Sequence, residues 1–157
     1  MKNKNTRFKY LVLLFAFILC LFSCVSVKAA NYYYEDGYKY TLSLGKATII
    51  SYVGSDTNLT VPSTLNGKPV VRIESSAFAN DNSLRSIVLP ETVTSMGVSI
   101  FAQCGNLQSV HYPEGLDRIY YRTFANCTKL TKVNVSSNVK FIENSAFANC
   151  TSLTYLD

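Results

Sequence analysis

The second half of this chain repeats every 23 residues, and the repeat is marked by phenylalanine. Each phenylalanine of the series stands in a variant of the phrase A-F-A-N-C-x-x-L. A fixed period of roughly 20 to 50 residues is typical of a solenoid, in which each unit buries its apolar face only against its neighbours. The period therefore predicts a stack of similar units without an enclosed catalytic pocket. The repeated positions are Phe78, Phe101, Phe124 and Phe147.

Other columns of the repeat are apolar as well. Between them Ser, Asn, Thr, Lys and Glu vary from unit to unit. We therefore expect the apolar columns to face the core and the variable positions to face water. The apolar columns are Ile73, Met96, Ile119 and Ile142; Leu84, Leu107, Leu130 and Leu153; Ile87, Val110, Val133 and Leu156; Leu89, Tyr112 and Val135; and Val93, Leu116 and Val139.

Each unit predicts two elements. The phrase S-L-x-S-I-x-L-P has apolar residues in period two and ends in proline, which is typical of a short strand. The phrase S-A-F-A-N-C is short, with Ser as a capping residue and Ala as a helix former, and favours a single α or 3₁₀ turn. We therefore predict an α/β solenoid with one parallel strand and one short helical turn per 23-residue unit.

Residues 30–72 are interpreted as an N-terminal β cap with a half-repeat. Asp36 with Gly37, and Gly45 with Lys46, are turn signals between alternating segments. Residues 59–65 repeat the spacing of residues 87–93 at a displacement of 28 residues instead of 23. An atypical terminal unit shields the first apolar layer of a solenoid.

Residues 1–29 have the composition of a secretory signal peptide. A cationic start precedes an apolar run at residues 11–22 and a V-K-A site that would be cut after Ala29. A retained membrane anchor over residues 10–27 is one alternative. A lipid anchor at Cys24, in a phrase that resembles a bacterial lipobox, is another.

Loss of the signal segment changes the charge of the chain. The segment holds five of the 15 basic residues and none of the 10 acidic ones, so ten of each sign remain. A net charge of zero removes the main electrostatic support for a nucleic-acid partner. The sequence therefore predicts no nucleic-acid binding.

Three cysteines remain in the mature chain, and they share one repeat column. Cys104, Cys127 and Cys150 stand 23 residues apart, where the first unit has Asp81. Secreted disulfide frameworks have paired and irregular spacings, so we interpret this column as small buried side chains in a turn. A disulfide or metal site between adjacent units is the alternative. No histidine stands in the column, which disfavours zinc, and we predict neither metal nor cofactor.

The full repeat phrase, I-x-x-S-A-F-A-N-C-x-x-L-x-x-I-x-L-P-x-x-V, resembles the BspA-type leucine-rich repeats of bacterial surface proteins over about residues 41–157. The resemblance implies a right-handed leucine-rich-repeat solenoid, secretion or surface display, and adhesion to host proteins, other bacteria or matrix. The chain departs from the family pattern at Asp81, at Tyr120 and at residues 135–136. Residues 73–157 hold four units, the last incomplete, so we expect the chain to be a fragment of a longer protein.

The sequence contains little that supports catalysis. His111 is the only histidine and stands at an outward strand position. Glu91 and Glu114 share a column after the proline, which is typical of a solvated ridge rather than of an acid/base pair. Phosphate-binding loops and clustered metal-ligand motifs are absent from the sequence. We therefore predict that the chain is not an enzyme and has no catalytic residues.

The outward strand positions favour binding. Variation at these positions leaves the core untouched, which is how repeat solenoids recognise partners. Tyr120 and Tyr121 form a second candidate patch, unless Tyr120 packs into the core. The two predicted rows of binding residues comprise Ser86, Val88, Ser109, His111, Lys132, Asn134 and Tyr155.

We expect a secreted or cell-surface binding module that mediates protein–protein or cell–matrix adhesion. Its partner would be an extracellular protein or glycan, with membrane contact only through the signal peptide or a lipid anchor at Cys24. One alternative is the N-terminal, non-catalytic targeting region of a larger exported enzyme, such as a wall hydrolase or protease. A passive structural spacer is a weaker alternative.

Overall fold

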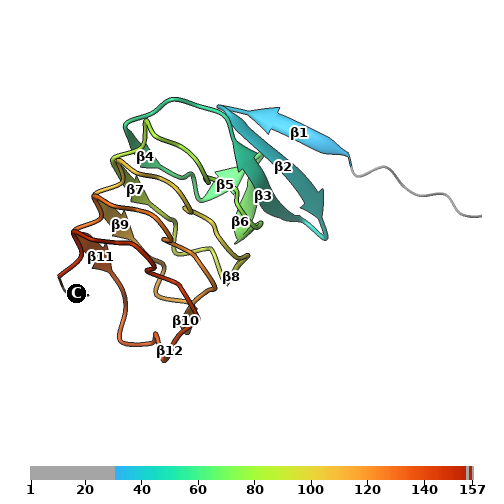
Figure 1. The fold of residues 1–157 in the computed structure, drawn as a ribbon. Helices are drawn as coiled ribbons and strands as arrows, with labels where there is room; N and C mark the ends of the chain where they lie inside the picture. The colour runs from blue at the N-terminus through green and yellow to red at the C-terminus, as the bar shows by residue number, and fades with distance from the viewer. Residues whose placement is uncertain (1–30, 155, 157) are drawn as a thin grey trace, which may run out of the picture. The chain divides into compact units, whose positions relative to one another are not determined.

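The computed structural model describes residues 31–154 and residue 156, so the predicted signal peptide, Cys24 and Tyr155 lie outside the described residues. Residues Asn31–Asp157 form one compact unit built from short strands (Figure 1). No helix in the described part of the chain is long and apolar enough to span a bilayer. The strands are β1 Tyr32–Glu35, β2 Tyr38–Ser43, β3 Lys46–Tyr52, β4 Asn58–Thr60, β5 Thr64–Leu65, β6 Lys68–Ile73, β7 Ser86–Val88, β8 Ser95–Met96, β9 Ser109–His111, β10 Arg118–Ile119, β11 Lys132–Asn134 and β12 Phe141–Ile142.

The predicted parallel strand of each unit is confirmed. Strands β4, β7, β9 and β11 form a four-stranded sheet in that order, and every pair in it is parallel. The register keeps the apolar column in line, because Leu59 pairs with Ile87, Ile87 with Val110 and Val110 with Val133. The half-repeat inferred at residues 59–65 therefore supplies the first strand of the sheet.

A second strand in each unit was not predicted. The parallel pairs β6 with β8 and β10 with β12 lie on another side of the stack. Strands β8, β10 and β12 have only two residues each. No backbone pair joins β8 to β10 within the described residues. The sequence analysis missed these strands because two residues are too few to show a period of two.

The predicted short helical turn is not confirmed, because the structure assigns no helix to the described residues. For the same reason the predicted α/β class is not confirmed. Residues 75–80 form successive turns instead. The amides of Ser76, Phe78 and Asn80 donate to carbonyls of the next unit, while those between them bond locally. Ser76 and Asn80 also have φ values of 60° and 65°, outside the right-handed helical region. A helix needs every amide to bond along its own segment, so this alternation excludes one.

The apolar columns form the core as predicted. Phe78, Phe101 and Phe124 are buried, and successive rings of the series stack with centroid separations of 5.5, 5.5 and 5.2 Å. Offset stacking at such distances is a favourable aromatic geometry. The column continues into the cap, because Tyr52 packs on Phe78 at 5.9 Å and Tyr38 on Tyr52 at 4.8 Å. In the fourth unit the prediction fails for Ile142 and Leu156, which are 54% and 37% exposed, so this layer is less covered than the others.

The cysteine column is a packing feature. Cys104 and Cys127 are buried, Cys150 is half-buried, and all three are free thiols. Each thiol donates to a phenylalanine carbonyl of the preceding unit, at sulfur–oxygen distances of 3.0, 3.1 and 3.0 Å. Burial raises the pKa of Cys104 to about 12 and that of Cys150 to about 11, so both thiols are protonated near neutral pH. In the first unit Asp81 accepts instead from the amides of Ser83 and Leu84.

The cap residues form an antiparallel extension of the second ladder. Strands β1, β2 and β3 pair in sequence, with turns after Glu35 and Ser43, and β3 then pairs in parallel with β6. The first turn matches the predicted signal at Asp36 and Gly37. The second lies at residues 44–45, one position before the predicted pair, because Lys46 already begins β3. Gly37 and Gly45 have φ values of 81° and 72° that suit glycine. Residues 30–72 thus join both sides of the stack, because β6 pairs with β8 and β4 pairs with β7.

Candidate functional site

The predicted binding rows lie in register on the sheet of β7, β9 and β11. Ser86 pairs with Ser109 and Ser109 with Lys132, while Val88 pairs with His111 and His111 with Asn134. All six residues are partly or fully exposed. We call this set the strand face. Tyr155, the seventh predicted residue, lies outside the described residues.

His111 is linked to the loop of the preceding unit. Its Nε2 lies 2.9 Å from Oε1 of Glu91, and the other Glu91 oxygen accepts from the amide of Glu114 at 2.7 Å. The hydrogen bond from the Glu114 amide lowers the pKa of Glu91, and His111 adds to that effect. Glu91 and Glu114, which were predicted to form a solvated ridge, are both exposed. Glu91 nevertheless connects its own unit to the next one through His111 and the amide of Glu114.

A shallow depression lies at the end of β9 and β11. Its volume of about 290 Å³ is at the lower limit of small-molecule pockets, which suits a side chain of a partner rather than a whole ligand. His111 and Asn134 belong to both the depression and the strand face. The lining residues are His111, Tyr112, Glu114, Asn134, Val135 and Ser136.

A second polar surface lies on the ladder of β6, β8, β10 and β12. Arg72 of β6 donates from Nε to Glu74 at 2.6 Å and from Nη2 to the other Glu74 oxygen at 3.3 Å. Its Nη1 donates to Oγ of Ser95 in the next unit at 2.5 Å. The bond from Arg72 lowers the pKa of Glu74. These contacts fix the orientation of the planar guanidinium and connect two units.

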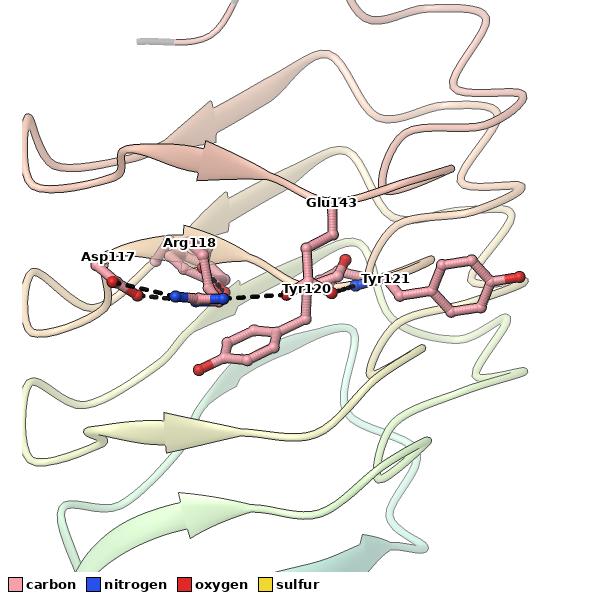
Figure 2. Close-up of polar contacts among 7 residues, drawn as sticks. Asp117, Arg118, Tyr120, Tyr121 and Glu143 are labelled. Atoms are coloured by element: carbon pink, nitrogen blue, oxygen red, sulfur yellow. Dashed lines mark hydrogen bonds and ion pairs between the residues drawn. The ribbon is translucent and has the colours of Figure 1, made fainter.

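The other end of this surface is built around Arg118 (Figure 2). Its Nε and Nη2 donate to the two oxygens of Asp117 at 3.0 and 3.4 Å, and its Nη1 lies 3.6 Å from Oε1 of Glu143. The second Glu143 oxygen accepts from the amide of Tyr121 at 2.9 Å. Glu143 of the fourth unit is therefore held against the third.

Tyr120 lies between the two arginine clusters. In Figure 2 its ring lies between β10 and β8, which are not paired with each other, while the Tyr121 ring points to the opposite side. Tyr120 is half-buried and packs against the core, as the sequence analysis had left open. One unit earlier the same position is Gly97, where a Cβ would meet the amide nitrogen of Ser75 at 2.3 Å.

Tyr112 lies next to the break between β8 and β10. It is the aromatic member of an aliphatic column, is 1% exposed, and donates from its hydroxyl to the carbonyl of Arg118 at 2.9 Å. The side chain therefore reaches β10 from the end of β9. Its hydrogen bond ties the start of β10 to the core next to this break.

Tyr120 and Tyr121 could be identified from the sequence, but the charged groups around Tyr120 were not predicted. We call the set of Arg72, Glu74, Ser95, Arg118, Tyr120 and Glu143 the Tyr120 face. The sequence did contain a signal for these groups. Arg72 and Arg118 stand two repeat periods apart, and Glu74 and Glu143 stand three periods apart, so each pair occupies one column of the repeat. The predicted single strand per unit concealed it, because these columns belong to the strands that were not expected.

Metal ligation has no support in the described residues. They contain no group of three or more His, Cys, Asp or Glu side chains arranged to hold an ion. The two surfaces offer hydrogen-bonding groups, charged side chains and an aromatic ring.

Solved bacterial proteins share this fold. A leucine-rich repeat protein from Bacteroides capillosus is 25% identical with a TM-score of 0.69, over 80% of this chain and 96% of that one. The leucine-rich repeat protein TpLRR of T. pallidum is 25% identical with a TM-score of 0.67, over 80% and 71%. A leucine rich cell surface protein from Faecalibacterium prausnitzii is 29% identical with a TM-score of 0.60, over 80% of this chain and only 39% of that one. The curated proteins contain no match to this chain.

The repeat itself matches a defined family. The pattern of the BspA type Leucine rich repeat region (6 copies) covers residues 48–157, which is more than half of the chain. The match begins within the segment interpreted as the cap. Together with the parallel ladders and the phenylalanine column, it shows that the chain belongs to the family of BspA-type leucine-rich repeat proteins.

Proposed function

We propose that this protein is a secreted or cell-surface adhesion module that binds an extracellular protein through its strand face, without catalysis. The observation that carries the proposal is the register of the two rows, which aligns exposed side chains of three successive units on one sheet. A solenoid presents such rows as an extended surface, in which each unit adds a few contacts.

The local chemistry supports a protein partner. Val88 is 43% exposed beside polar neighbours, and the depression next to His111 and Asn134 offers a place for an anchoring side chain. Interfaces commonly combine a central pocket with a polar rim. The description of the F. prausnitzii relative as a cell surface protein supports surface display of this chain as well.

The test uses a variant of the strand face in which Ser109, His111 and Asn134 are all changed to Ala. Binding of the wild-type chain to immobilised collagen, laminin and fibronectin is measured by biolayer interferometry. We expect binding to at least one of them. Loss of three contacts near the centre of an interface should weaken that binding by at least about tenfold.

The matched control changes three exposed residues of the β2–β3 hairpin, Ser43, Leu44 and Lys46, to Ala. Its binding should equal that of the wild type. Equal binding by the wild type, the control and the strand-face variant would refute the assignment of this face. Failure of the wild-type chain to bind any of the three proteins would count against adhesion to matrix.

A further inference from the structure

We propose that the Tyr120 face is a separate binding site for a neutral oligosaccharide. The site lies on the ladder of β6, β8, β10 and β12, whereas the strand face lies on the sheet of β4, β7, β9 and β11. The two surfaces therefore have different strands and different side chains. The proposal does not depend on the function assigned to the strand face.

The aromatic element of the site is Tyr120. Its ring is half-buried in the interval between β10 and β8, so one part packs on the protein and the rest faces outwards (Figure 2). The C–H groups on one side of a pyranose ring carry partial positive charge, and an aromatic face attracts such groups through its quadrupole. A fixed, partly exposed ring is therefore a suitable platform for a sugar.

Hydroxyl-binding groups flank the ring on both sides. The contacts of Arg72 and Arg118 described above use three of the five N–H donors of each guanidinium, which leaves two donors for a ligand. The carboxylates also retain acceptor capacity, because the side chains of Glu74 and Glu143 are 38% and 33% exposed. Adjacent sugar hydroxyls match pairs of planar donors and acceptors.

The charge of the site favours a neutral ligand. Two arginines face three carboxylates, namely Glu74, Asp117 and Glu143, so the charges nearly cancel. An anionic ligand would compete with carboxylates that already hold both guanidiniums in bidentate geometry. A neutral ligand rich in hydroxyl groups takes the remaining donors and acceptors and leaves these ion pairs intact.

The site is also pre-organised. Each half of the site is held by a contact between units, because Arg72 bonds to Ser95 and Arg118 pairs with Glu143. Side chains that are already held lose little conformational entropy when a ligand binds. A ligand that follows the ladder from Arg72 to Arg118 spans units, which favours an oligosaccharide over a single sugar.

The test measures binding of cellohexaose, maltohexaose and mannohexaose to the full chain by isothermal titration calorimetry, with heparin as the anionic arm. We expect at least one neutral hexasaccharide to bind more tightly than about 1 mM. The affinity should change little between low and high salt, because no net charge is neutralised. Tyr120→Ala should weaken binding by about tenfold or more, by loss of one stacking contact.

Tyr121→Ala is the matched control, since its ring points away from the site (Figure 2). It should bind as the wild type does. Arg118→Lys keeps the charge but loses the planar fork, and it should weaken binding even if Tyr120→Ala fails to fold. The proposal is overturned if no neutral hexasaccharide binds, if only heparin binds, or if Tyr121→Ala loses as much affinity as Tyr120→Ala and Arg118→Lys.

Discussion

One column of the repeat, directly before the cysteine column, has a left-handed backbone in all four units. Three of its residues are asparagine and one is glutamine. Asn80, Asn126 and Asn149 have φ values of 65°, 64° and 60°, while Gln103 holds φ 66° at the equivalent place. Asparagine tolerates this region better than other residues that carry a Cβ, because its short amide bonds locally. The preference is thus visible in the repeated A-N phrase. Gln103 is the exception to it.

Gln103→Asn should therefore stabilise the protein by a few tenths of a kcal/mol to about 1 kcal/mol. Gln103→Val should destabilise it by roughly 1 to 2 kcal/mol, because β-branched residues fit this region worst. The free energy of unfolding is measured by urea titration. Gln103 is exposed, so loss of buried contacts does not obscure the comparison. Equal stability of the two variants would contradict a backbone origin of the asparagine column.

At the scale of elements, the sequence determined some strands more clearly than others. Strands β7, β9 and β11 were predictable because Ile87, Val110 and Val133 are each followed two residues later by another apolar column, Leu89, Tyr112 and Val135. The second ladder was not, because its strands have two residues and its pairing depends on contacts between units. The helical turn was predicted wrongly from local propensity, since alternate amides bond to the next unit instead.

The candidate surfaces follow the same division. The strand face could be predicted because the register of parallel strands preserves the repeat period, which places Val88 beside His111. The Tyr120 face could not, because it depends on a break between β8 and β10 that no local pattern encodes. The hydrogen bond from Tyr112 to a carbonyl of β10, next to that break, is likewise not visible in the repeat pattern.

The Glu91 contact links two units and should make stability depend on pH. Its folded-state pKa is lowered, first by the Glu114 amide and then by His111, below an unfolded value of about 4.3. A carboxylate of this kind contributes stability above the unfolded pKa and loses it as pH falls through the folded pKa. The free energy of unfolding of Glu91→Gln should therefore be lower than that of the wild type near pH 6.

The same difference should shrink below about pH 4, as the wild-type carboxylate becomes protonated. Urea titrations of both proteins at several pH values measure it. Glutamine keeps an oxygen that accepts from the Glu114 amide, so the comparison isolates the charge. A difference that persists unchanged to about pH 3 would contradict the contact.

At the scale of the whole solenoid, each unit is stabilised mainly by its neighbours. The central layers are buried on both sides, as Ile87 and Val110 are 1% and 2% exposed, whereas Phe141 and Ile142 of β12 are each 54% exposed. Stability in such a stack is close to a sum of unit and nearest-neighbour terms. In the 157-residue chain, opening of the fourth unit breaks its interface with the third, and opening of a central unit breaks two interfaces.

Native-state hydrogen exchange of the 157-residue chain should reveal this gradient. The amide of Phe141 donates to the backbone carbonyl of Asp117 at 3.2 Å. It should exchange through a local opening whose free energy depends little on denaturant concentration. The amides of β7 and β9 should exchange only through larger openings, with a steep dependence on denaturant, because their strands pair on both sides. Uniform protection from β7 to β12 would show instead that the units unfold together, and the nearest-neighbour description would then fail for this protein.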